Sequence, residues 1–258
     1  MMFRLSILAQ LMLMIAGFAF VSCSSDEIAP DQPVTPEQPD GQVPEAFMVN
    51  ENKYNTLQEA VHAAMKLEDG AVIKLTADTT GDGFQVKRND AGSPDENFVE
   101  GKSFTIDFGG YDYKLNRGRF LEVCKSNVTI TGMGGSLRNE TWDNVLIVHG
   151  GDVTIKGKLY INGKMQLINT HNSSFSEGYE GTFTGDISTH EAEWFVDSDK
   201  AVLNVGSLHS ESSFLHVVNA KSVNINFFAT DTENPVKADN SASLNIHQGP
   251  DKINYVTR

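Results

Sequence analysis

The amino-acid sequence predicts an all-β solenoid, a parallel β-helix with a capping α-helix at its N-terminal end. First, a short phrase with a central Thr or Asn beside apolar residues recurs at intervals of 20–30 residues. Second, apolar and polar residues alternate within each phrase, which is the period of a β-strand. Third, the intervening segments carry Gly, Asn, Asp and Ser rather than apolar residues at helical spacing. Self-similarity at this period is typical of a solenoid. The seven phrases are SFTID (103–107), NVTIT (127–131), DVTIK (152–156), TFTGD (182–186), VLNVG (202–206), SVNIN (222–226) and SLNIH (243–247).

The alternation within each phrase predicts which side chains face the core. Successive side chains of a strand point to opposite faces, so the apolar positions should point inward. These positions are Phe104, Ile106, Val128, Ile130, Val153, Ile155, Leu203, Val205, Val223, Ile225, Leu244 and Ile246. Coils stack about 4.8 Å apart, so the residue after each first apolar position should join one outward row. That predicted row is Thr105, Thr129, Thr154, Thr184, Asn204, Asn224 and Asn245.

The segment before the first phrase predicts the cap. Residues 56–59, Thr-Leu-Gln-Glu, have the form of a capping box and open an amphipathic helix over about 56–67. Such a helix would cover the apolar surface and strand edges at the end of a solenoid. A first coil strand follows at 71–75. Because 169–181 is almost wholly polar, we expect a loop within the irregular unit at 157–181.

The helix and the phrases together resemble a known family. The passage YNTLQEAVHAAMKLEDGAVIKL (54–75), followed by repeats such as SFTIDFGGYDYKL (103–115), looks like the pectin-lyase-like superfamily. The resemblance covers residues 47–258 and implies a right-handed parallel β-helix. That superfamily contains polysaccharide lyases, hydrolases, tailspikes, adhesins and other surface proteins, so the resemblance implies the fold more specifically than an activity.

The N-terminal residues predict a targeting segment. A basic Arg4 precedes an apolar run of signal-peptide length, which ends at Val-Ser-Cys with the cysteine at position 23. This resembles a bacterial lipoprotein signal, with 1–22 removed and Cys23 lipidated; a plain secretory signal is the alternative. Residues 23–46 are rich in Pro and acidic residues, which predicts a disordered tether. The folded domain is then 47–258.

The predicted location follows from these features. Acidic residues directly after Cys23 resemble a surface-export tag, so we expect a lipid anchor in the outer membrane and exposure on the cell surface, with the periplasmic side as the alternative. Lipidation of Cys23 would leave Cys124 as the other cysteine, so no internal disulfide is expected.

The net charge of the chain disfavours some classes of binding partner. The formal net charge is −14, which disfavours nucleic acid and anionic lipid surfaces. The partners that we expect are the outer membrane, through the N-terminal lipid, and a polysaccharide or another surface ligand.

The predicted outward row supplies the candidate ligand-binding residues. Thr184, Asn204, Asn224 and Asn245 would present hydroxyls and amides to sugar hydroxyls, and Trp194 would stack on a sugar ring if it were exposed. Each has a structural alternative. An exposed polar ladder explains the row equally well because such side chains hydrogen-bond one another, and Trp194 suits the core.

Catalytic and metal-binding chemistry has weaker support. Carboxylate pairs of glycosidases need a fixed separation, but Asp107 and Asp186 fall three coils apart, and we assign no catalytic residues. His216 and Lys237 are candidate row neighbours with a remote acid–base role. Asp197, Asp199 and Asp239 offer oxygen ligands for a weak Ca²⁺ site, although solvated acidic corners are the more common explanation; no other cofactor is expected.

Three functional hypotheses remain. The first is a non-catalytic surface module that binds a glycan or another ligand along an outer face. The second is a polysaccharide lyase or glycoside hydrolase acting on an extracellular polysaccharide. The third is a structural accessory of an outer-membrane complex.

Overall fold

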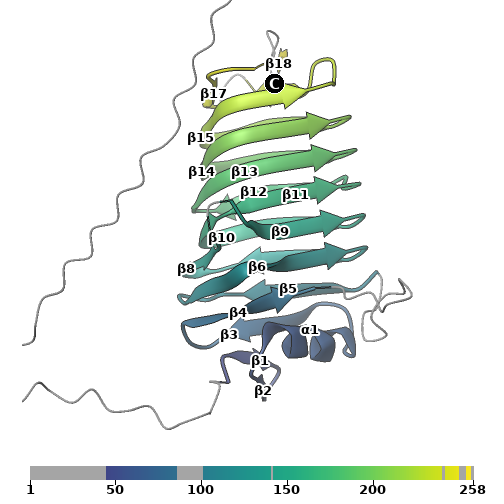
Figure 1. Ribbon diagram of the computed structural model, residues 1–258, viewed down its shortest axis with the longest axis vertical. Helices are drawn as coiled ribbons and strands as arrows, with labels where there is room; N and C mark the ends of the chain where they lie inside the picture. The colour runs from purple at the N-terminus through teal and green to yellow at the C-terminus, as the bar shows by residue number, and fades with distance from the viewer. Residues whose placement is uncertain (1–44, 86–100, 141, 240–241, 250–253, 257–258) are drawn as a thin grey trace, which may run out of the picture. The chain divides into compact units, whose positions relative to one another are not determined.

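The computed structural model describes residues 45–85, 101–140, 142–239, 242–249 and 254–256. It is 68% strand and forms a parallel β-solenoid of about 6 turns with very little helix. In Figure 1 the front strands run from left to right while the coils climb from the N-terminal to the C-terminal end, which is a right-handed winding. The predicted fold class is therefore confirmed.

Parallel pairing in the described coils forms three ladders, which we name faces A, B and C in the order in which each coil visits them. Long strands bend across two or three faces. Face A contains β3 (Ala71–Leu75), β5 (Ser103–Asp107), β7 (Asn127–Thr131), the first part of β10 (Asp152–Asn162), β12 (Ser173–Tyr179), the first parts of β14 (Glu193–Glu211) and β15 (Phe214–Thr230), β16 (Val236–Asp239) and β18 (Asn254–Val256).

The other two faces share several of these strands. Face B contains the first parts of β4 (Thr79–Phe84) and β6 (Asp112–Cys124), then β8 (Met133–Arg138), the end of β10, the first part of β13 (Thr182–His190), the middle parts of β14 and β15, and β17 (Leu244–Ile246). Face C contains the ends of β4 and β6, then β9 (Asn144–His149), β11 (Lys164–Ile168) and the ends of β13, β14 and β15.

The core lies between the faces and is filled by the predicted inward residues. Phe104, Val153, Leu203 and Ile225 are typical, with at most 4% of their surface exposed. Leu244 is only partly buried but still packs against the core, because it lies on the last described rung of face B. The strand period therefore identified the inward positions correctly.

The predicted outward row is split between two faces. Thr105, Thr129 and Thr154 lie in register on face A, but the next rung there is Ser174, not Thr184. Thr184 lies on face B, where its neighbour below is Asn162. A single row from Thr105 to Asn245 is therefore wrong.

The cause is the segment that was expected to be a loop. Residues 173–179 form β12, a rung of face A, so the chain gains one strand more than the phrase spacing implies. The strand has little apolar signal because Ser173, only 1% exposed, occupies an inward position beside Phe175 and Tyr179. Val153 N–H donates to the hydroxyl of Ser173 at 3.1 Å, which satisfies this buried polar group.

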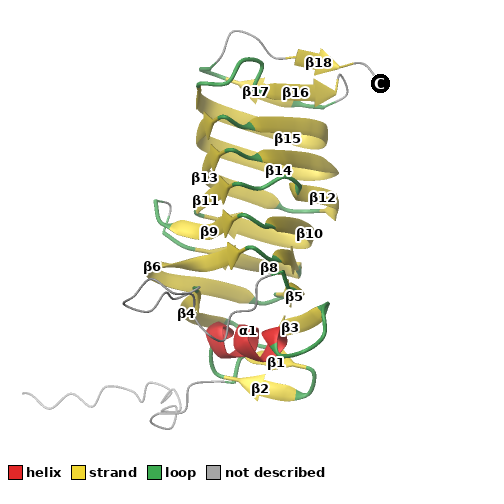
Figure 2. Ribbon diagram, turned by 90° about the vertical axis from the view of Figure 1, so that its right-hand side faces the viewer, coloured by secondary structure: helices red, strands yellow, loops and turns green. Residues whose placement is uncertain are grey.

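The N-terminal end is capped as predicted. β1 (Phe47–Val49) pairs antiparallel with β2 (Asn52–Tyr54) and with β3, and α1 (Leu57–Met65) contacts β1, β3 and β4 at the base of the stack (Figure 2). Thr56 is the N-cap, and its reciprocal bonds with Glu59 complete the capping box. The buried face of α1 consists of Leu57, Ala60, Val61, Ala64 and Met65. In the described part of the chain no helix is long and apolar enough to cross a membrane.

A repeated backbone conformation forms the corner between faces C and A. Lys125, Gly150, Asn169, Glu191 and Ser212 each have a φ between 47° and 62°. On each of the first four, the N–H donates to a carbonyl of the coil above, as in the 2.8 Å bond from Lys125 to His149. Each of these four N–H groups is therefore satisfied where the chain turns from face C to face A.

Candidate functional site

The candidate ligand-binding residues form a continuous row on face B. Thr184 pairs with Asn204, Asn204 with Asn224, and Asn224 with Asn245. Asn162 extends the row one coil below. The register thus brings together all four predicted polar residues and adds one that the single-row alignment missed.

Hydrogen bonds run along this row. Asn224 Nδ2 donates to Asn204 Oδ1 at 3.3 Å, and Asn245 Nδ2 donates to Asn224 Oδ1 at 3.1 Å. Asn224 Nδ2 also lies 3.0 Å from the hydroxyl of Ser222. This is the ladder foreseen as the structural alternative. An Asn side chain offers two donors and two acceptor lone pairs, so the ladder fixes these amides and leaves part of their capacity facing solvent.

The upper part of face B is uncharged at its outward positions from Tyr160 onward. The exposed Lys158, in register with Met133, borders these positions at the start of the fourth rung. From Tyr160 to the last rung of this face, the described positions between the buried residues are all uncharged. We call them the B strip: Tyr160, Asn162, Thr182, Thr184, Val202, Asn204, Ser222, Asn224 and Asn245.

Two interactions between neighbouring coils involve charged groups at the borders of the B strip. Lys200 Nζ lies 2.9 Å from Glu180 Oε2, and this hydrogen bond lowers the pKa of Glu180 and raises that of Lys200. Asp186 Oδ1 accepts a 2.8 Å bond from Ser207 N–H on the coil above. Both interactions tie neighbouring coils together at the edges of the strip.

Below the B strip the same row becomes charged. Asn162 is in register with Arg138, and Arg138 with Lys114. Arg138 Nη2 lies 3.7 Å from Asp112 Oδ2. The other carboxylate oxygen, Asp112 Oδ1, accepts a hydrogen bond from the Ser136 hydroxyl at 2.7 Å. The neutral strip therefore begins at the fourth coil, where the Tyr160 ring is 44% exposed.

Trp194 does not join the ligand-binding residues. Its side chain is only 2% exposed and points into the core from β14, so its ring is not available to a ligand. The core alternative was correct because Trp194 shares inward parity with Val196. Tyr160 instead supplies an exposed ring on face B.

The three predicted calcium-binding aspartates are not assembled. Asp197 is in register with Asn219 of the next coil, and Asp239 lies on β16, one coil further on. Within the described ranges, no group of three or more His, Cys, Asp or Glu side chains is placed to hold a metal ion. Asp197, Asp199 and Asp239 therefore give no geometric support to the predicted Ca²⁺ site.

Face A has a hollow that the sequence did not reveal as a unit. Phe195, His216 and Lys237 are in register on successive coils, which confirms that His216 and Lys237 are row neighbours. The ring of His216 stacks on Phe195 at 4.9 Å, and its Nε2 lies 2.8 Å from Glu193 Oε1. Phe195, His216 and Lys237 line a cavity of about 380 Å³ together with Asp239. Strand parity in this region was ambiguous in the sequence, so the hollow was missed.

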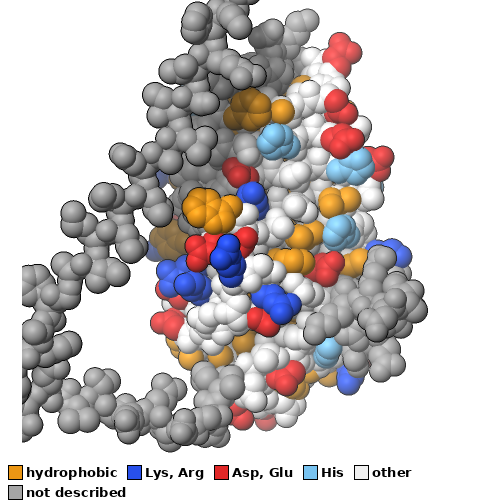
Figure 3. Space-filling view, in the orientation of Figure 1, with side chains coloured by type: hydrophobic (Ala, Val, Ile, Leu, Met, Phe, Trp, Pro, Cys, Tyr) orange, Lys and Arg blue, Asp and Glu red, His pale blue; other side chains and the backbone are white. Residues whose placement is uncertain are grey.

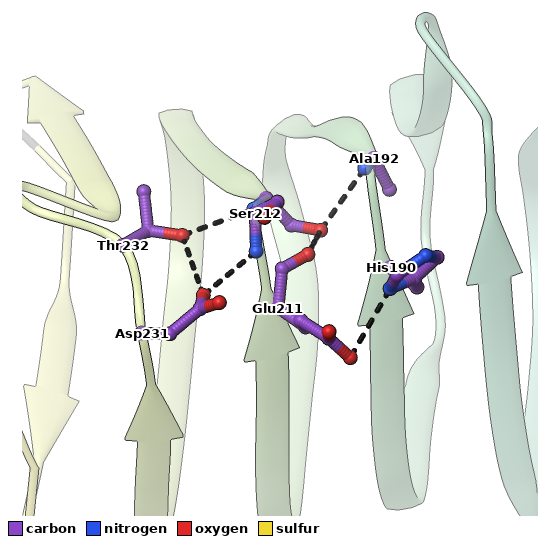
Figure 4. Close-up of polar contacts among 7 residues, drawn as sticks. His190, Ala192, Glu211, Ser212, Asp231 and Thr232 are labelled. Atoms are coloured by element: carbon purple, nitrogen blue, oxygen red, sulfur yellow. Dashed lines mark hydrogen bonds and ion pairs between the residues drawn. The ribbon is translucent and has the colours of Figure 1, made fainter.

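A polar network closes the corner between faces C and A near the C-terminal end (Figure 4). His190 Nδ1 lies 3.1 Å from Glu211 Oε2 on the next coil. Ser212 N–H donates to Asp231 Oδ1 at 2.7 Å, which takes the place of the carbonyl acceptor used by the coils below. This bond is the main reason that the pKa of Asp231 is lowered. The network joins three successive coils.

Histidines and acidic side chains also appear along this side of the molecule in the space-filling view, in pale blue and red at the right of Figure 3. The surface there is open, with a hollow of about 460 Å³ lined by Ser188, His209 and the His190–Glu211 pair among others. Because the polar groups in Figure 4 satisfy one another between coils, we assign this corner a structural role.

The fold does not bring together Asp107 and Asp186, the two carboxylates considered for glycoside hydrolysis. Asp107 lies on face A and accepts from Gly109 N–H at 2.8 Å, whereas Asp186 lies at the corner between faces B and C. The two candidates thus point to different sides of the solenoid. Comparison with known proteins adds no assignment, since no family model, curated protein or solved structure matches this chain.

Proposed function

We propose that the protein is a non-catalytic cell-surface module that binds a polysaccharide along the B strip. The observation that carries the proposal is the in-register row of Asn162, Thr184, Asn204, Asn224 and Asn245 on an uncharged face. Amides and hydroxyls both donate and accept hydrogen bonds, as sugar hydroxyls do.

The ladder supports binding by fixing the side chains in advance. Asn204, Asn224 and Asn245 are held by bonds of 3.1–3.3 Å, so a ligand would meet amides that have already lost much of their rotamer freedom. Binding to a pre-organised surface costs less conformational entropy. Tyr160 adds an exposed ring at the lower end of the row, beside Asn162, where a sugar ring has an apolar face to cover.

The proposal includes a lipid anchor at Cys23 and a position on the outer face of the outer membrane. Support comes from the sequence, because residues 1–44 lie outside the described residues. The resemblance to pectin-lyase-like proteins belongs to the same proposal and rests on residues 47–258. Cys23→Ala should prevent acylation and release the protein from membranes, and unchanged membrane anchoring would refute this part.

A glycan array probed with the purified full chain tests the binding proposal. We expect binding to at least one glycan class, and loss of that signal in the double variant Asn204→Ala/Asn224→Ala. Ser188→Ala/His209→Ala on face C is the matched control and should bind normally. Absence of binding to every glycan would contradict the proposal, and release of unsaturated or reducing ends from a bound polysaccharide would contradict the non-catalytic part.

A further inference from the structure

We infer that the ligand of the B strip is an uncharged polysaccharide chain lying along the solenoid axis. This inference rests on the proposed function and specifies its ligand class. It follows from three features of the described surface: the neutrality of the strip, the pairing of charges at its borders, and the direction of the row.

The first feature sets the chemistry that the strip can satisfy. Its side chains are the amides of Asn, the hydroxyls of Thr, Ser and Tyr, and the half-buried Val202. These groups match sugar hydroxyls and offer no cation to a carboxylate or sulfate. A charged group that leaves water without an opposite charge or strong donors loses solvation that neutral partners only partly replace. An acidic sugar would therefore lose solvation of its charge at every rung of the strip without gaining a cation in return.

The second feature concerns the nearest cations. The corner between faces A and B carries both lysines and acids, among them Lys158, Lys200 and Lys221, and Glu177, Glu180 and Asp199. Lys200 is paired with Glu180, and at the lower end Arg138 lies 3.7 Å from Asp112. Beyond the range of these pairs the formal net charge of −14 repels an acidic polymer. Such repulsion acts over a Debye length of about 8 Å at physiological salt.

The third feature gives the ligand its shape. Asn162, Thr184, Asn204, Asn224 and Asn245 are separated by four steps between coils, which is about 19 Å at about 4.8 Å per step. One small sugar would contact only part of this row. A chain that follows the axis meets the same kind of donor and acceptor at every coil, with Tyr160 available to stack at one end.

The experiment compares matched glycans on the full chain. The probes are polysaccharides offered as pairs on one backbone, such as hydroxyethylcellulose with carboxymethylcellulose and laminarin with sulfated laminarin, within an array that also contains other neutral and acidic glycans. We expect every binder to be neutral, affinity to rise with oligosaccharide length until the row is covered, and affinity to change less than about twofold between about 0.05 M and about 0.5 M NaCl.

Two outcomes would overturn the inference in different ways. Preferred binding of an acidic glycan that weakens as salt rises would refute the ligand class and leave binding by the strip intact. Binding to no glycan would refute the proposed function itself, and the inference with it. A length dependence that stops at one or two sugars would refute the axial chain.

A charge-placement variant sharpens the same test. Asn204→Lys puts a cation in the middle of the B strip, so it should raise affinity for the acidic member of a matched pair about three- to tenfold. Ser188→Lys adds the same net charge on face C and should leave that affinity unchanged. Equal gains from both variants would show that net charge, and not the neutrality of the strip, selects the ligand.

Discussion

Faces A and B are built from the same sequence phrase on one core, yet their outer surfaces differ. On face A, the row contains Thr105, Thr129 and Thr154 in the lower coils and Phe195, His216 and Lys237 in the upper coils. On face B, the upper row consists only of Thr and Asn. Because of β12, the phrase moves from face A to face B between Thr154 and Thr184, and the change from Thr to Asn, between Thr184 and Asn204, falls within face B.

The comparison separates the inward residues, which support the core, from the outward residues, which form the surface. Inward positions obey one rule on both faces, since each coil buries apolar side chains against the coils above and below. Outward positions are free of that constraint, so a row of one kind that persists over several coils can reflect a ligand. Face A does not keep one kind of residue, whereas the B strip stays uncharged over its whole described length.

The largest expected effect tests whether buried side chains under faces A and B contribute equally to stability. Leu203 on face B and Leu215 on face A are at most 1% exposed, so Leu203→Ala and Leu215→Ala should each lower the free energy of unfolding by about 2–5 kcal/mol. Urea unfolding followed by circular dichroism measures this. The outward neighbour variant Asn204→Ala should cost no more than about 1 kcal/mol. An equal loss of unfolding free energy in Leu203→Ala and Asn204→Ala would contradict the distinction between inward residues that support the core and outward residues that form the surface.

The next effect tests whether the two surfaces differ in binding. Tyr160 on face B and Phe214 on face A have matched exposures of 44% and 43%. Tyr160→Ala should weaken binding of an array-selected glycan at least about tenfold, which corresponds to about 1.4 kcal/mol. Phe214→Ala should leave it unchanged. Isothermal titration calorimetry measures both affinities, and equal loss in the two variants would argue against face B as the binding surface.

Alkaline pH tests the core through two buried tyrosines, Tyr113 on β6 and Tyr179 on β12. Burial raises the pKa of Tyr113 from its ordinary value of 10.0 to about 12, and burial also raises the pKa of Tyr179. Above about pH 10 the unfolded chain releases these protons while the folded chain holds them. The unfolded state then binds fewer protons, so stability should fall between about pH 10 and about pH 12. Urea midpoints across this range measure the slope, and an unchanged slope in Tyr113→Phe would contradict the assignment.

The smallest effect separates the same two tyrosines at neutral pH. The hydroxyl of Tyr113 accepts from Gly83 N–H at 2.9 Å, whereas among the described residues the buried hydroxyl of Tyr179 has no hydrogen-bond partner. Tyr113→Phe should therefore lower the free energy of unfolding by about 1 kcal/mol, and Tyr179→Phe should leave it unchanged or raise it by up to about 1 kcal/mol. Thermal unfolding measures the difference, and the opposite order would show that the hydroxyl of Tyr179 is satisfied.

Local patterns in the sequence predicted the solenoid, its cap and its inward residues. The capping box at Thr56 and the alternation at Val223 and Ile225 depend on neighbours along the chain, so they can be recognised without the structure. Register between coils depends on strands far apart in sequence. The buried Ser173 hid β12, and that one missing strand moved Thr184 to the wrong row. The stack of His216 on Phe195 could not be foreseen for the same reason.

The side-chain amide resonances of Asn162, Asn204, Asn224 and Asn245 test the central claim most directly. The measurement is a ¹⁵N-correlated NMR titration of the isotope-labelled protein with a neutral oligosaccharide selected on the array. The account predicts that these four amides shift together and saturably, while backbone amides beside Phe195 and His216 on face A stay in place. Shifts confined to face A, with the four asparagine amides unmoved, would contradict it.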